Sequence, residues 1–432
     1  MAAVPAGTGP AGQGIRRTRL DSGLRVVTEE LPALRSVSVG FWVGVGSRDE
    51  HDHEFGASHF LEHLLFKGTA DRSAAQIADA VESVGGDMNA FTAQEMTAFY
   101  VRVPEEQLDL ALDILSDVVW SPALRAKDVD AERNVILEEL HMRDDAPDDI
   151  VHELFAHAMF PDHPLGREVL GTQQSIEQMT RDSIASFHDR HYRPSSIVVA
   201  AAGNLTHDRV VDRLTRRADA LELGPDVDLA RSVEGLAPAR PRAVISKPVE
   251  QVHVVMGTRS VAREDPDRYP LTVLNQALGG GMSSRLFQEV RERRGLAYSV
   301  YSYRVAYVEI GAFGVYAGTA PGRAAETIDV LGAELDRVIR DGGITDDELV
   351  AAKGHLKGSM VLALETSNSR MHRLGSGELM LGEALSLDEV TALVEAVTPD
   401  DVDRVVRRLF SSGSRTLAVV GPLDETAVAA LG

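Results

Sequence analysis

The pattern of apolar positions predicts that the two halves of the chain begin alike. Residues 36–50 (SVSVGFWVGVGSRDE) and 251–265 (QVHVVMGTRSVARED) each contain alternating or continuous apolar residues that lead into a polar turn. Such runs are typical of β-strands with at least one buried face. Each is followed by apolar residues at helical spacing. Both halves are therefore predicted to start with a strand and to continue into helices.

The two halves also end alike, because residues 179–205 align without gaps to residues 397–423. In both copies a threonine followed by aspartate two positions later is typical of a helix N-cap. An amphipathic helix then leads to an apolar strand that ends at Gly203 or Gly421. This repeated unit of helix and strand predicts a duplicated α+β domain, although a duplication can also serve architecture alone.

A segment rich in Gly, Pro and Ala near the middle of the chain is typical of a linker. The 432 residues leave room for two to four domains. We therefore predict a short N-terminal tail and two domains of similar length. Their boundaries are a flexible tail over 1–14, a first domain over 15–222, a linker over 223–242 and a second domain over 243–432.

Composition excludes several classes of function. Forty-four Lys and Arg residues against 66 Asp and Glu residues give a net charge of −22, which repels nucleic acid and anionic lipid. Without cysteine, any metal must be held by nitrogen and oxygen ligands. The sequence contains neither an apolar run of about 18 residues nor a secretory signal, so we expect no membrane association and a cytoplasmic location.

The first half contains a metal-binding pattern. Residues 56–69 (GASHFLEHLLFKGT) predict a helix that places His59, Glu62 and His63 on one face, which is the inverted zincin pattern H-x-x-E-H. A catalytic zinc site needs a third ligand from elsewhere. Residues 131–140 (AERNVILEEL) offer Glu132 and Glu139, seven positions apart on one face of a second predicted helix. The alternative is a partly buried helix with two incidental histidines.

With these motifs the chain resembles the pitrilysin-type zinc metallopeptidases, and among them the bacterial single-chain relatives of the mitochondrial processing peptidase beta subunit. The resemblance implies that His59, His63 and Glu139 bind Zn²⁺. It assigns Glu62 as the general base and places Glu132 with it in the catalytic group, as a glutamate behind the ligands. The second half has no H-x-x-E-H, so we expect it to be metal-free.

The resemblance also implies two substrate-binding regions. In residues 89–100 (NAFTAQEMTAFY), Asn89, Ala90 and Thr92 match an edge strand that pairs with an extended peptide, although by itself this stretch predicts only two strands with a short turn. Arg291 and Tyr298 match a pair that binds substrate across the cleft from zinc. Without the family resemblance, an arginine in an arginine-rich stretch such as the one around Arg291 is more often a solvated surface charge.

These features together predict an α+β protein of two duplicated domains. Each has a mainly antiparallel sheet with helices packed on it, and the two form a clamshell around a cleft. The expected activity is that of a zinc endopeptidase, similar to the processing peptidases, acting on extended peptides or unstructured segments as a homodimer or as a heterodimer with a related subunit. A non-catalytic scaffold or partner subunit is the alternative, and a non-peptidase metal hydrolase is a third. We expect His51, His53 and His141 to face solvent.

Overall fold

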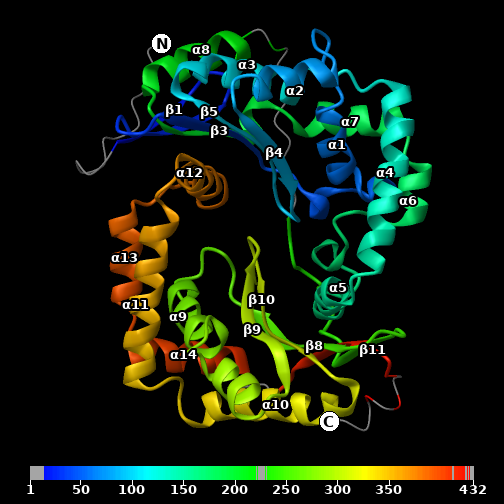
Figure 1. Cartoon of the computed structure of the whole chain (residues 1–432), viewed down its shortest axis with the longest axis vertical. Coiled ribbons are helices and arrows are strands. Elements are labelled where there is room, and N and C mark those ends of the chain that lie inside the picture. The colour runs from blue at the N-terminus through cyan, green and yellow to red at the C-terminus, as the bar shows by residue number, and fades with distance from the viewer. Residues whose placement is uncertain are drawn as a thin grey trace. The chain divides into compact units, whose positions relative to one another are not determined.

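The computed structural model describes residues 14–219, 221, 229, 231–410, 413–423, 426 and 428. Contacts between residues divide the chain into two compact units, each built around one sheet (Figure 1). The first unit comprises Met1–Leu140, Glu168–Ala230 and Val361–Ser386; the second comprises His141–Arg167, Arg231–Met360 and Leu387–Gly432. In the described part of the chain, no helix has the length and apolar character that crossing a membrane requires.

The first unit holds a six-stranded sheet. Across the sheet the strands are β1 (Ile15–Arg19), β2 (Arg25–Glu30), β6 (Ile197–Gly203), β3 (Ser36–Val43), β5 (Thr97–Pro104) and β4 (Asp87–Thr92). Every neighbouring pair is antiparallel except β2 and β6, which run parallel. Because β4 pairs only with β5, it forms one edge of the sheet.

The second unit holds a five-stranded sheet with the same plan. Its strands are β7 (Arg242–Ser246), β11 (Thr416–Gly421), β8 (Val252–Ser260), β10 (Gly311–Thr319) and β9 (Ala297–Ala306), with β7 and β11 as the parallel pair. Helix α7 (Arg181–His191) precedes β6, as α14 (Pro399–Phe410) precedes β11. The predicted repeat of helix and strand is therefore confirmed, and with it the duplicated α+β fold.

One face of each sheet carries most of the helices. In the first unit they are α1 (Ala57–Leu65), α2 (Ala74–Glu82), α3 (Leu108–Trp120), α4 (Ala126–Asp144), α6 (Gln173–Gln178), α7 and α8 (His207–Ala218). In the second unit they are α9 (Arg268–Gly279), α10 (Ala324–Arg340), α11 (Asp346–Ala363), α13 (Leu387–Glu395) and α14. Apolar side chains of these helices form the two larger cores with the strands beneath them.

The opposite face of each sheet carries a helix that is encoded in the other half of the chain. Helix α12 (Ser367–Leu381) packs on β3 and β6 in the first unit, and α5 (Pro147–Met159) packs on β11 and β8 in the second. The approach of α12 requires glycine, because a Cβ atom at Gly375 would lie 2.0 Å from Nε1 of Trp42. The two units thus exchange helices.

The compact units differ from the expected division of the chain in these exchanged segments, 141–167 and 361–386. The expected division of the sequence into a first domain over 15–222 and a second domain over 243–432 stays a prediction. Of the expected tail and linker, residues 1–13, 223–228 and 230 lie outside the described residues. The expected clamshell also stays a prediction.

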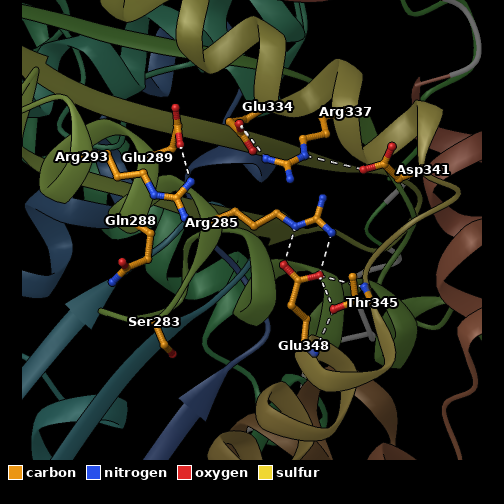
Figure 2. Close-up of a pocket in the computed structure, with 10 residues that line it drawn as sticks. All are labelled: Ser283, Arg285, Gln288, Glu289, Arg293, Glu334, Arg337, Asp341, Thr345 and Glu348. Atoms are coloured by element: carbon orange, nitrogen blue, oxygen red, sulfur yellow. Dashed lines mark hydrogen bonds and ion pairs between the residues drawn. The ribbon is translucent and has the colours of Figure 1, made fainter.

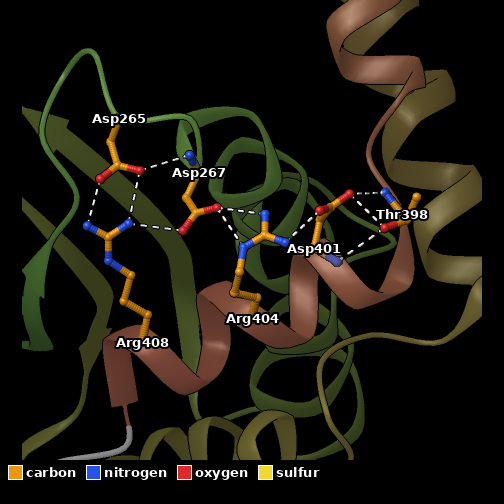
Figure 3. Close-up of polar contacts among 6 residues, drawn as sticks. All are labelled: Asp265, Asp267, Thr398, Asp401, Arg404 and Arg408. Carbon is orange, nitrogen blue, oxygen red and sulfur yellow. Dashed lines mark hydrogen bonds and ion pairs between the residues drawn. The ribbon is translucent and has the colours of Figure 1, made fainter.

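A network of ion pairs fastens α14 to the loop before α9 (Figure 3). Buried Asp267 accepts hydrogen bonds from Arg404 at 2.7 and 3.0 Å and from Arg408 at 3.0 Å, and Arg408 also binds Asp265.

We expect Asp267→Ala to lower the free energy of unfolding by about 1–3 kcal/mol, because it removes a buried acceptor of charged hydrogen bonds. Denaturant unfolding would measure this, with Arg407→Ala, which breaks only a surface pair with Asp403, as the control expected to change little.

Candidate active site

Helix α1 is positioned by its N-terminus and by its apolar face. Gly56 precedes the helix with φ of 93°, a left-handed conformation that favours glycine. The buried carboxylate of Glu50 accepts hydrogen bonds from the backbone N–H groups of Gly56 at 2.8 Å and Ser58 at 2.7 Å. Burial raises the pKa of Glu50 to about 8, against the opposing effect of these hydrogen bonds. The apolar side chains of α1 are fully buried; they are Phe60, Leu61, Leu64 and Leu65.

The other face of α1 brings two histidines to one point with a glutamate from α4. Oε2 of Glu139 lies 3.6 Å from Nε2 of His59 and 3.6 Å from Nε2 of His63. One donor atom from each residue lies within 4.8 Å of the others. Two imidazoles and one carboxylate form a donor set found in catalytic zinc sites. Burial lowers the pKa of His59 to about 4, so this ring is neutral at pH 7, as metal ligation requires.

Glu132 lies behind His63 instead of beside the shared point. Its Oε1 atom is 2.9 Å from Nδ1 of His63, and its Oε2 atom is 2.6 Å from Nζ of Lys67. When Nδ1 carries the ring proton and donates a hydrogen bond to Glu132, the lone pair of the His63 ring is on Nε2, which faces Glu139. The predicted glutamates therefore have separate positions. Glu139 lies at the point that it shares with the two histidines, which is the candidate metal-binding point, and Glu132 lies within hydrogen-bonding distance of His63.

We expect Glu132→Ala to weaken zinc binding by about 10–100-fold, the usual cost of losing a partner that orients a histidine ligand. Competition with a chelator of known affinity would measure the change. Glu138→Ala is the matched control, because Glu138 is exposed on the same helix and should leave zinc affinity unaltered. Equal affinities in the two variants would contradict the orienting role of Glu132.

Glu62 lies beside the metal-binding point and is tied to the edge strand. The hydroxyl of Thr92, at the end of β4, donates a hydrogen bond of 2.5 Å to Oε2 of Glu62. Burial raises the pKa of Glu62 and the charge of Glu139 adds to this, while the Thr92 hydrogen bond and His63 oppose it. A carboxylate with a raised pKa is suited to accept and return a proton near neutral pH.

We expect Thr92→Val in the zinc-loaded protein to move the acid limb of the pH–rate profile to higher pH by about one unit. The lost hydrogen bond stabilises the ionised carboxylate, so its loss raises the pKa of Glu62, and a hydrogen bond to a charged group contributes about 1.5 kcal/mol. Since a base acts only when ionised, turnover would then begin to rise at higher pH. A limb that stays in place or moves to lower pH would contradict this role of Thr92.

The edge strand carries the three predicted substrate-binding residues. Asn89, Ala90 and Thr92 lie on β4, and the two strands predicted for this stretch are confirmed as β4 and β5. The side-chain Oδ1 of Asn89 accepts a hydrogen bond of 2.8 Å from the backbone N–H of Ala90. Peptide binding at this edge stays a prediction.

Comparison with known proteins identifies the family. Residues 25–173 match the model described as insulinase (peptidase family M16), and residues 178–356 match the peptidase M16 inactive domain. The chain is 48% identical over 421 residues to an uncharacterized zinc protease of Streptomyces coelicolor, covering 95% of this chain and 90% of that protein. The chain belongs to the M16 peptidase family. An uncharacterized zinc protease of Bacillus subtilis is 38% identical over 408 residues, covering 94% of this M16 chain and 98% of the relative.

Solved structures agree with the M16 fold. A protease from Helicobacter pylori is 25% identical, with a TM-score of 0.87 over 95% of this chain and all of that chain. A Pseudomonas fluorescens structure described as a peptidase M16 inactive domain has the same TM-score at 22% identity, covering 95% of this chain and 98% of its own, which supports the fold alone. The predicted resemblance is confirmed, and the names of the relatives point to zinc and to peptidase activity.

The Arg291–Tyr298 pair lies in the second M16 unit. Arg291 is in a π-helical segment, Phe287–Arg293, and Tyr298 is at the start of the edge strand β9. The guanidinium carbon lies 4.3 Å from the centre of the Tyr298 ring, and Nη1 donates a hydrogen bond of 3.1 Å to the Tyr298 carbonyl. Tyr298 as a whole residue is 79% exposed. The two residues are in contact, and their position opposite the zinc ligands stays a prediction.

The second M16 unit also contains a polar pocket that was not predicted from the sequence (Figure 2). It has a volume of about 250 Å³ and is lined by arginine and acidic side chains. Arg285 forms a two-pronged pair with Glu348, with both N···O distances at 2.6 Å. Arg293 pairs with Glu289, and Arg337 with Asp341, as Figure 2 shows. Charge is therefore largely balanced within the pocket.

Proposed function

We propose that the chain is a zinc endopeptidase that cleaves extended peptides or unstructured segments, in the manner of the processing peptidases. The observation that carries this proposal is the convergence of His59, His63 and Glu139, with their donor atoms within 4.8 Å of one another. Glu62 lies on the same helix, one position before His63. The names of the M16 relatives as zinc proteases give it independent support.

The proposed chemistry assigns one task to each side chain. His59, His63 and Glu139 would hold zinc, which when bound supplies a Lewis acid that activates water and polarises a carbonyl. Glu62 takes a proton from the attacking water and returns it to the leaving amine when the peptide bond breaks. Thr92 holds one oxygen of Glu62, leaving the other to exchange the proton.

Substrate would bind along the open edge of β4. An extended peptide can extend this sheet through backbone hydrogen bonds, which do not depend on the peptide's sequence. Thr92 supports this proposal, because it belongs to the same strand and also contacts Glu62. A peptide paired with β4 would therefore run beside the proposed base. Arg291 and Tyr298 are proposed to donate hydrogen bonds to peptide carbonyls.

The test is peptidase activity of the purified chain on a mixed library of unstructured peptides, with metal content measured in parallel. The assay is run as purified, after removal of metal by a chelator, and after zinc is restored. We expect cleavage inside the peptides that is lost with the metal and recovered with zinc. Stoichiometric zinc without cleavage of any peptide would favour the alternative function, that of a non-catalytic scaffold or partner subunit. If adding a related subunit to the same assay restores cleavage, the active form is a heterodimer.

A further inference from the structure

A second group of metal-binding side chains lies just before α1. His51 immediately precedes a short 3₁₀ helix, Asp52–Glu54, that contains His53. One donor atom from each of His51, His53 and Glu54 lies within 4.8 Å of the others. This is the only group besides His59, His63 and Glu139 that has such spacing among the described residues. It shares no residue with the proposed catalytic centre.

The geometry of this group suits a metal ion. Nδ1 of His51 lies 2.8 Å from Oε2 of Glu54, and Nε2 of His53 lies 3.9 Å from Oε1 of the same carboxylate. Ligand atoms of a tetrahedral zinc site are roughly 3.3 Å apart, as bonds of about 2.0–2.1 Å require. The two separations lie on either side of that value. The two imidazole rings are stacked, with their centres 5.6 Å apart.

The three side chains differ in burial, so the carboxylate is held in one position and the two imidazole rings are free to turn. The side chain of Glu54 is only 3% exposed and is held by Arg190, whose Nη2 donates a hydrogen bond of 2.6 Å to Oε1. The side chains of His51 and His53 are 63% and 75% exposed. The exposed rings can turn by small amounts toward a shared ion, while the carboxylate stays in place.

We propose that His51, His53 and Glu54 form a second binding site for Zn²⁺ or a similar divalent transition metal. Imidazole nitrogen and carboxylate oxygen are the ligands that such ions accept in a protein without cysteine. The site is open to solvent, so water completes the coordination. It binds more weakly than the site at His59, His63 and Glu139, because Arg190 places a positive charge beside Glu54 and because two ligands must be ordered on binding.

Metal titration of the full chain tests this site independently of peptidase activity. Equilibrium dialysis against Zn²⁺ or Co²⁺, followed by metal analysis, is expected to give one tightly bound and one weakly bound ion. The double variant His51→Ala/His53→Ala should lose the weak ion and keep the tight one, together with the activity of the parent. The double variant His59→Ala/His63→Ala should lose the tight ion and keep the weak one.

A matched control separates the proposed site from unspecific binding to exposed histidines. His141→Ala/His355→Ala removes two exposed histidines that belong to neither group, and it should still bind both ions. Glu54→Gln keeps both rings of the site but removes the carboxylate charge, and it should weaken the second ion by about tenfold or more. A parent chain that binds a single ion, or a weak ion that persists in His51→Ala/His53→Ala, would overturn the proposal.

Discussion

Replacement of Glu62 by Gln is expected to lower peptidase turnover by about 10²–10⁴-fold while zinc stays bound. The amide has nearly the same shape as the carboxylate and can still accept the hydrogen bond from Thr92. It cannot accept a proton from water, so the step that generates the nucleophile loses its base. Turnover of a peptide that the parent chain cleaves, and zinc content of the same preparation, measure the two halves of the prediction.

The control for Glu62→Gln is Glu138→Gln, which makes the same chemical change at an exposed position of α4. This variant should keep the turnover of the parent chain. Undiminished turnover in zinc-loaded Glu62→Gln would show that another group takes the proton. Loss of zinc together with turnover would instead show that Glu62 contributes to the metal site.

Replacement of Glu139 by Ala is expected to abolish zinc retention and peptidase activity together. Its Oε2 atom is equally distant from Nε2 of His59 and of His63, so its removal leaves two ligands on one helix. We expect zinc affinity to fall by more than about 100-fold, beyond the upper end of what the loss of an orienting partner costs. Metal content after dialysis and turnover at limiting zinc would measure the effect.

The neighbouring variant Glu138→Ala tests whether position on the helix decides this effect. Both substitutions remove a carboxylate from α4, but Glu138 is exposed and Glu139 is half-buried at the metal-binding point. Glu138→Ala should therefore retain zinc. If Glu139→Ala also retains zinc at the affinity of the parent chain, the assignment of the third ligand is wrong.

Local patterns were sufficient for much of the fold and for the centre of the site. The spacing of His59, Glu62 and His63 determines that they share a helical face, because an α-helix places positions i and i+4 one turn apart. The repeat of α7 and β6 in α14 and β11 could be predicted for a similar reason, because helix and strand periodicity depend on residues close in sequence.

The different positions of Glu132 and Glu139 could not be predicted from local sequence patterns. Their spacing placed both on one face of a helix, and only the family resemblance chose between them. The structure separates them by the histidine nitrogen that each contacts, Nδ1 for Glu132 and Nε2 for Glu139. That difference depends on how α4 packs against α1, which residues far apart in the sequence decide.

The placement of α5 and α12 was likewise beyond the sequence. An apolar stripe such as Met371 and Leu374 on α12 indicates that a helix face is buried, but not which sheet covers it. The structure packs each of these helices on the sheet of the other half of the chain. A close fit between Gly375 and the Trp42 ring, rather than periodicity, matches α12 to its sheet.

The sequence by itself determined the elements, their duplication and the two histidines of the candidate metal site, since these follow from interactions between near neighbours along the chain. Tertiary structure decided which groups from distant parts of the chain meet. It brought Glu139 to the two histidines, and it buried Glu54 against Arg190, 136 positions away, beside two histidines that the sequence correctly placed in solvent. The physical reason is that packing, not spacing, sets the distances between side chains on different elements.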